Sequence, residues 1–208
     1  QPLLIETGVA LTSSVVMLAV AEKAQAESDG LFYERGFLKN VLKDYSGAIA
    51  DFTKAIEINP RHSKAYGNRG IAKGQLKDYS GAIDDLNKAI EIKPRYATAY
   101  LNRGLAKNKL GDNYGAISDY SKAIEINPEF AKAYSNRGIA KLELRYFEEA
   151  IADFTKAIDI NPRYAEAYIN RGAAKKLSGD SQDACFDARK GNSLGSSKGF
   201  KAVELFCQ

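Results

Sequence analysis

Charged and amide side chains that could recognise a ligand recur at a fixed spacing in this 208-residue chain. Arginine stands at five positions 34 residues apart, aspartate follows each arginine by 16 residues, and asparagine directly precedes four of the arginines. Guanidinium groups pair with carboxylates, whereas side-chain amides both donate and accept hydrogen bonds. The chemistry that these residues offer is therefore recognition.

The recurring charges allow two interpretations. The arginines are Arg35, Arg69, Arg103, Arg137 and Arg171, and the aspartates are Asp51, Asp85, Asp119, Asp153 and Asp187. The arginines could form a cationic ladder for an acidic ligand. We favour pairing of each arginine with an aspartate, because a guanidinium on the packed side of a helix needs a partner and both residue types repeat equally faithfully. Such pairs would hold the repeats in register.

Catalytic and metal-binding sets are missing from the sequence. The single histidine, His62, lies in a turn where other repeats carry Tyr96, Phe130 and Tyr164, so we expect its ring to pack. No second histidine or suitably spaced cysteine pair offers a metal site, and no glycine-rich phosphate loop is present. The sequence therefore predicts no enzyme activity, no cofactor and no metal.

The fixed spacing also predicts the architecture. Pro60, Pro94, Pro128 and Pro162 stand 34 residues apart, and a period of this length indicates a repeat array. With residue 29 counted as position 1, glycine recurs at position 8, alanine at positions 20 and 27, and a large apolar residue at position 24. Spacings of three and four predict two helices per repeat. Small residues would let these helices approach closely while a neighbouring ring fills the gap.

Two runs carry a family resemblance. Residues 65–70 (AYGNRG) and 88–94 (KAIEIKP) are similar to the tetratricopeptide repeat, or TPR, and the resemblance covers roughly residues 29–195. It implies an all-α, right-handed superhelical solenoid of helix-turn-helix repeats, whose first helices line a concave groove that binds peptides or protein segments. We expect five repeats in residues 29–195 and a capping helix in residues 196–208.

The resemblance also indicates which residues face the groove. The candidates are Tyr33, Phe37, Asn68, Leu101, Asn102, Asn136, Ile169 and Asn170. A row of asparagines can bind the backbone of an extended peptide without reading its sequence, or it can bond within its own array. The family's carboxylate clamp uses lysine at position 5 and asparagine at position 9, and this chain has neither there. An apolar stripe flanked by amides instead suits a hydrophobic or amphipathic segment.

The overall charge does not point to nucleic acid. The formal net charge is +4, but the lysines at positions 11 and 26 recur beside the periodic aspartates. Charges of mixed sign on helix exteriors form a solvated face. We therefore expect a protein or peptide partner and no nucleic acid.

The N-terminal segment, residues 1–28, differs in kind from the repeats. An uncharged run from Thr7 to Ala21 precedes the sequence Ala24-Gln25-Ala26, which reads as a secretory signal cleaved after Ala26. Alternatively, residues 1–26 are retained as a hydrophobic helix that tethers the chain to a membrane. Both alternatives imply export.

The C-terminal end predicts export independently. In the fifth repeat Cys185 replaces the isoleucine of position 21, and no proline closes the repeat. A short helix with Phe200, Val203 and Cys207 on one face would cap the array and bring Cys207 over Cys185. A disulfide there indicates an oxidising compartment such as a bacterial periplasm or a thylakoid lumen, the alternative being two buried free thiols.

These observations lead to two functional hypotheses. The first is a non-catalytic protein–protein interaction scaffold, exported with or without a membrane tether, which binds a partner segment in its groove. The second is a structural subunit or assembly factor of a membrane protein complex, for example a photosynthetic or envelope complex. The second would use the outer surface and the hydrophobic helix while the groove stays empty.

Overall fold

The computed structural model describes residues 28–208, which form helices joined by short turns, with no strand in this range. The expected N-terminal signal or membrane helix falls in residues 1–27 and lies outside the described residues. Among helices of the described part of the chain, none combines the length and the apolar character needed to cross a bilayer.

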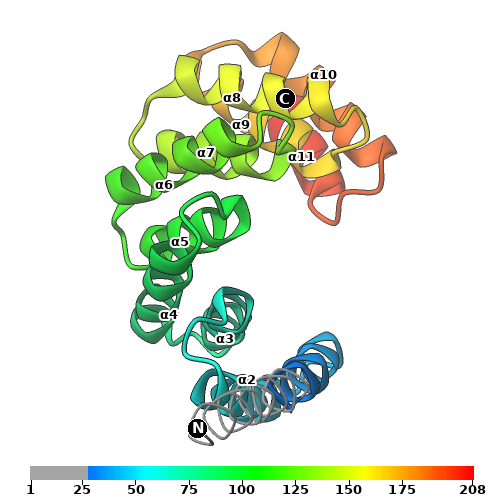
Figure 1. Ribbon diagram of the computed structural model, residues 1–208. Helices are drawn as coiled ribbons and strands as arrows, with labels where there is room; N and C mark the ends of the chain where they lie inside the picture. The colour runs from blue at the N-terminus through cyan, green and yellow to red at the C-terminus, as the bar shows by residue number, and fades with distance from the viewer. Residues whose placement is uncertain (1–27) are drawn as a thin grey trace, which may run out of the picture. The chain divides into compact units, whose positions relative to one another are not determined.

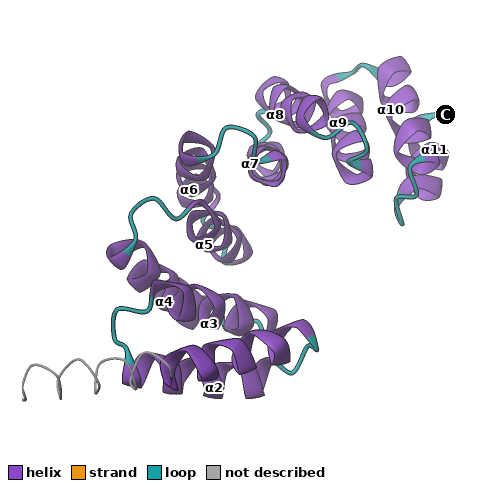
Figure 2. Ribbon diagram, turned by 45° about the vertical axis from the view of Figure 1, so that its right-hand side comes forward, coloured by secondary structure: helices purple, strands orange, loops and turns teal. Residues whose placement is uncertain are grey.

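The chain divides into two compact units between Ile92 and Lys93. The first unit contains the helical residues 28–41, α2 (Tyr45–Ile58), α3 (Ser63–Gln75) and α4 (Tyr79–Ile92). The second contains α5 (Ala97–Lys109), α6 (Asn113–Ile126), α7 (Ala131–Glu143), α8 (Phe147–Ile160), α9 (Ala165–Ser178), α10 (Ser181–Ser193) and α11 (Gly199–Phe206). Figures 1 and 2 show the helices following one another along each unit.

Within each unit, consecutive helices pack against each other, so that the predicted all-α class of tandem helix pairs is confirmed. Aspartate side chains cap the second helices of several repeats, as where Asp112 accepts a hydrogen bond from the Gly115 amide at 2.8 Å. The turn before each second helix contains a residue with positive φ. These residues are Lys43, Lys77, Gly111, Arg145 and Gly179.

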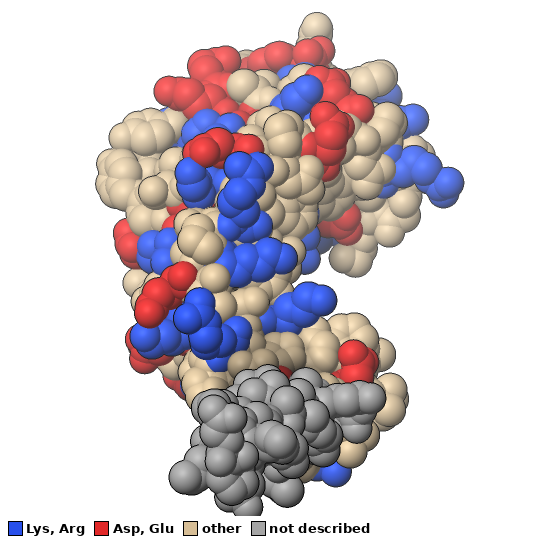
Figure 3. All heavy atoms as spheres, in the orientation of Figure 1, with Lys and Arg blue, Asp and Glu red and all other residues tan. Residues whose placement is uncertain are grey.

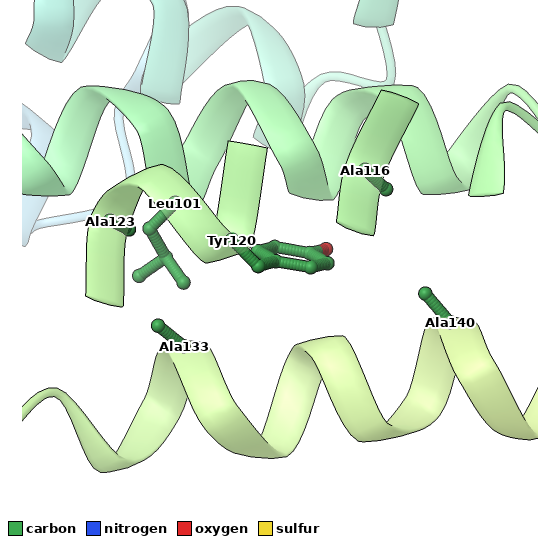
Figure 4. Packing of buried hydrophobic residues seen from close by; sticks show 6 residues of the cluster. All are labelled: Leu101, Ala116, Tyr120, Ala123, Ala133 and Ala140. Carbon is green, nitrogen blue, oxygen red and sulfur yellow. The ribbon is translucent and has the colours of Figure 1, made fainter. Parts of the chain in front are cut away.

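The core alternates large and small side chains, as the spacing predicts. Figure 4 shows the Tyr120 ring and Leu101 lying among alanines of α6 and α7. A Cβ atom on Gly104 would lie 2.7 Å from Cε1 of Tyr120, and one on Gly138 would lie 2.8 Å from Cε1 of Phe154. Only glycine at position 8 therefore allows the two helices of a repeat to approach this closely.

The C-terminal helix α11 covers the last repeat. The fifth repeat carries Ala188 at position 24, and Phe206 of α11 lies against Gly172, where a Cβ atom would meet its ring at 3.4 Å. Ala202 and Val203 of α11 also pack there. A disulfide joins Cys185 to Cys207 and spans 22 residues.

One expected feature of this cap is wrong. Phe200 is exposed and does not share the packed face with Val203. The reason is register: the apolar contacts use the spacing from Ala202 and Val203 to Phe206, which turns Phe200 toward solvent.

Candidate functional site

The arginines and aspartates form a bidentate ion pair in every repeat. In the fourth repeat, Arg137 Nε donates to Asp153 Oδ2 at 2.9 Å and Nη2 donates to Oδ1 at 2.7 Å. Lys141 Nζ lies 2.7 Å from the same carboxylate. The other pairs are Arg35 with Asp51, Arg69 with Asp85, Arg103 with Asp119, and Arg171 with Asp187. The favoured interpretation is therefore confirmed, and the arginines are not a ladder for an acidic ligand.

The same arginines connect neighbouring repeats. Nη1 of Arg69 donates to the Thr53 hydroxyl of the preceding repeat at 3.0 Å, and Nη1 of Arg171 donates to the Thr155 hydroxyl at 3.1 Å. The Arg171 guanidinium also lies over the Tyr168 ring, 5.5 Å from its centroid. These contacts fix the register between helix pairs.

The charged network shifts the pKa of its members. The hydrogen bond from Arg35 lowers the pKa of Asp51 to about 2 against the opposing effect of burial, and Lys39 lowers it further. The hydrogen bond to Asp187 raises the pKa of Arg171. Both groups thus stay charged at neutral pH.

In the first unit, the groove candidates Tyr33 and Asn68 bind each other. Asn68 Nδ2 donates to the Tyr33 hydroxyl at 3.0 Å, and the Tyr33 ring stacks on His62 with centroids 4.9 Å apart. His62 Nδ1 in turn accepts from the Ala65 amide, so this ring packs as expected. Phe37 remains exposed and free to contact a ligand.

Two groove candidates in the second unit are buried in the core, although Ile169 also reaches the lining of a neighbouring pocket. Leu101 is buried against Tyr120 and Ala133, and Ile169 is buried against Ala188 and Ala202. Their position in the repeat turns them toward the next helix pair, where larger side chains gain more from burial than in the groove. We therefore do not propose either residue as a main ligand contact.

The asparagines of the second unit have different environments. Asn102 Nδ2 donates to the Thr98 carbonyl within its own helix at 2.7 Å. Asn136 and Asn170, by contrast, line a pocket of about 190 Å³ between α7, α9 and the turn before α11. Its other lining residues are Ser135, Ile139, Tyr164, Glu166, Ile169, Ser196 and Lys198.

Asn136, which lines this pocket, carries a hydrogen-bond donor that no described residue accepts. Its Nδ2 atom is buried and has no hydrogen-bond partner within the described residues. A buried amide without a partner costs free energy, which an acceptor on a bound ligand would recover. A ligand oxygen could accept from this amide once the Asn136 side chain turns toward the pocket, whose lining also includes Ile139 and Tyr164.

The charges around the pocket have both signs. Lys198 and Glu166 lie on its lining, one a donor and the other an acceptor for a polar ligand. Figure 3 shows the same mixture of basic and acidic side chains over the visible face of the molecule. This mixture suits a peptide backbone, which presents donors and acceptors together.

Six pocket residues were not among the candidates from the sequence, and they are Ser135, Ile139, Tyr164, Glu166, Ser196 and Lys198. Glu166 is the only acidic residue at position 2 of the five repeats, a departure that could have drawn notice. Tyr164 occupies a position that is aromatic in other repeats, and Ser196 and Lys198 follow the periodic region. No periodic signal identifies such residues as pocket residues.

Known families and solved structures resemble the chain along most of its length. Models described as "TPR repeat" match residues 75–111 and 146–179, and models described as "Tetratricopeptide repeat" match residues 97–130 and 31–62. No curated protein sequence matches the chain.

Three solved structures illustrate the similarity of fold. The MamA protein is 24% identical, with 84% of this chain and 96% of that chain covered and a TM-score of 0.71. YrrB, described as a TPR protein with an unusual peptide-binding site, is 19% identical, with 92% and 97% covered and a TM-score of 0.71. PilF of Pseudomonas aeruginosa is 16% identical, with 88% and 86% covered and a TM-score of 0.78.

Proposed function

This chain belongs to the tetratricopeptide repeat family, and we propose that it is a non-catalytic scaffold that binds an extended segment of a protein partner. The observation that carries the proposal is the buried Asn136 Nδ2 donor, which has no partner among the described residues and belongs to a side chain that lines a pocket shared with Asn170. The peptide-binding site named for the structurally similar YrrB supports the same class of ligand.

The pocket suggests how the segment is held. A backbone carbonyl of the partner accepts from Asn136, while Asn170 and Lys198 contact neighbouring polar groups. A pocket of about 190 Å³ has room for one side chain of modest size, which would pack against Ile139 and Tyr164. Recognition would thus combine sequence-independent backbone bonds with one apolar anchor.

The experiment that tests this function uses random dodecapeptides displayed on phage. Peptides selected on the full chain are measured by calorimetry against N136A, N170A and the control N102A. Asn102 occupies the same repeat position but bonds to its own helix, so its loss should leave peptide affinity unchanged. We expect N136A to weaken binding at least tenfold, about 1.4 kcal/mol. Equal affinity of wild type and N136A would refute the proposal.

We further propose that the scaffold works in an oxidising compartment, a bacterial periplasm or a thylakoid lumen. The Cys185–Cys207 disulfide supports this, because such bonds persist mainly outside reducing cytosol. Fractionation of cells, with N-terminal sequencing of the mature chain, tests both export and the fate of residues 1–26. Recovery of the chain with reduced cysteines from the cytosol would contradict it.

A further inference from the structure

The first helix of the array exposes an apolar face. In the helical residues 28–41, Leu31 is 66% exposed and Leu38 is 57% exposed. At about 100° per residue, two positions seven apart lie within about 20° of each other, so both leucines form one stripe. The exposed Val41 and Leu42 extend this stripe at its end. We call Leu31, Leu38, Val41 and Leu42 the N-terminal face.

The other repeats show what normally covers this face. Leu31 and Leu38 occupy positions 3 and 10, which are alanine in the other four repeats. These alanines are buried, and they are Ala65, Ala72, Ala99, Ala106, Ala133, Ala140, Ala167 and Ala174. Ala140 packs with Tyr120, and Ala174 packs with Phe154, each a large residue on the preceding helix. Alanine at these positions therefore complements a large side chain at position 24.

Leucine at the same positions requires a different partner. A large residue at position 24 facing Leu31 and Leu38 would overfill the contact, because helix interfaces alternate large with small side chains. If two helices both carry leucine at positions 3 and 10 and neither presents a position-24 side chain, their leucines can fill the space between helix axes about 8–10 Å apart. A second copy of the same helix meets this condition.

The ion pair of the first repeat is more exposed than those of the other repeats. The side chain of Arg35 is 49% exposed, whereas those of Arg69, Arg103, Arg137 and Arg171 are 15–19% exposed. Arg35 bonds to Asp51 through Nε and Nη2. Within the described residues, no hydroxyl meets it as Thr53 meets Arg69. Part of the Arg35 guanidinium is therefore available to a second chain.

An acidic residue flanks the N-terminal face on one side and a basic residue flanks it on the other. Relative to Leu38, Glu34 lies about 40° to one side of the helix and Arg35 about 60° to the other. When two such helices pack in parallel about a two-fold axis, the side that carries Glu34 in one copy meets the side that carries Arg35 in the other. This contact forms twice and fixes the orientation.

The opposite end of the array does not offer the same contact. There α11 packs on α9 and α10 and is held by the Cys185–Cys207 disulfide. A second chain cannot stack its first repeat directly on the fifth repeat while α11 occupies that place. We propose that the N-terminal face binds the same face of a second copy of this chain, giving a two-fold dimer.

Sedimentation equilibrium of the full chain tests this proposal. Wild type should have twice the 22.7 kDa chain mass, and L31E/L38E should have the single mass. The control is L76E/L110E, because these leucines are similarly exposed, at 49% and 54%, but lie outside the N-terminal face. The control should remain dimeric, and thermal melts by circular dichroism verify that all variants fold. A monomeric wild type, or association that persists in L31E/L38E, would overturn the proposal.

A cross-linking experiment tests the orientation. In the parallel dimer, Leu38 of each copy meets Leu38 of the other, so L38C should form an intermolecular disulfide on mild oxidation while the Cys185–Cys207 bond stays intact. L110C serves as the matched control and should stay uncross-linked. A stable dimer in which L38C forms no more cross-link than L110C would show that another surface makes the contact.

Discussion

Asp153 is buried between its two helices and accepts two hydrogen bonds from the guanidinium of Arg137, at 2.9 and 2.7 Å. Asp51 makes the same pair with Arg35, but Arg35 is half-exposed. The two sites have identical chemistry and different access to water. A comparison of the two sites therefore isolates the effect of burial on the strength of an arginine–aspartate pair.

We predict that D153A destabilises the protein more than D51A. Loss of Asp153 leaves the largely buried Arg137 and Lys141 without their carboxylate, which should lower the free energy of unfolding by about 3 kcal/mol. Water can replace Asp51 around the more exposed Arg35, so that loss should be smaller. Urea unfolding followed by circular dichroism measures both. Equal losses of unfolding free energy in D153A and D51A would contradict the role assigned to burial.

Acid should remove the contribution of Asp51 in a defined range. Because Arg35 lowers the pKa of Asp51 to about 2 from an ordinary value of about 4, its stabilising effect is complete above about pH 4 and declines as the pH falls toward 2. The stability difference between wild type and D51N should therefore be largest above pH 4 and shrink below it. Urea midpoints between pH 6 and pH 2 give this difference, and a constant value would show that Asp51 has no depressed pKa.

Alanine should have opposite effects at two helical glycines. In G138A the new Cβ would lie 2.8 Å from Cε1 of Phe154, and overpacking of this kind costs about 1–3 kcal/mol. In the control G74A the nearest atom, Cβ of Ala82, is 3.9 Å away, so better helix propensity should stabilise by about 0.5–1 kcal/mol. Thermal melts of both variants check the signs. A stabilised G138A would show that the helices of this repeat can separate without loss.

Removal of the disulfide should loosen the C-terminal cap. A bond that closes a loop of 22 residues contributes about 3 kcal/mol by the chain-entropy estimate. C185S/C207S should therefore melt at a lower temperature than wild type in oxidising buffer. A reductant should lower the wild-type melting temperature to that of the variant and leave the variant unchanged. If the reductant lowered the melting temperatures of both proteins equally, its effect would not come from this disulfide.

The periodic sequence predicted the repeated contacts because the same neighbours recur in every repeat. Asp153 follows Arg137 by the interval that separates every other pair, so one correct interpretation held for five ion pairs. The contact between glycine at position 8 and a large side chain at position 24 was predicted from the same regular spacing. Contacts of this kind depend on local spacing within one helix pair, which the sequence displays directly.

The groove could not be predicted with the same success. Asn102 and Asn136 occupy the same position and have almost the same neighbours in sequence, yet one bonds to its own helix and the other lines a pocket. Ser196 and Lys198, which follow the array, line the pocket beside Asn136. The repeat period predicts the contacts that all repeats share. It does not predict contacts made by a segment that follows the repeats.

The helix pairs and the ion pairs could be placed from the sequence, because they follow from residues at fixed intervals, and the only two cysteines present, Cys185 and Cys207, favoured a disulfide over two free thiols. The packing of the helices was needed to show that Leu101 and Ile169 are core residues and that Phe206 fills the place left small by Ala188. Burial depends on which helix lies opposite a side chain and how closely, and for the end repeats that neighbour is outside the repeating pattern.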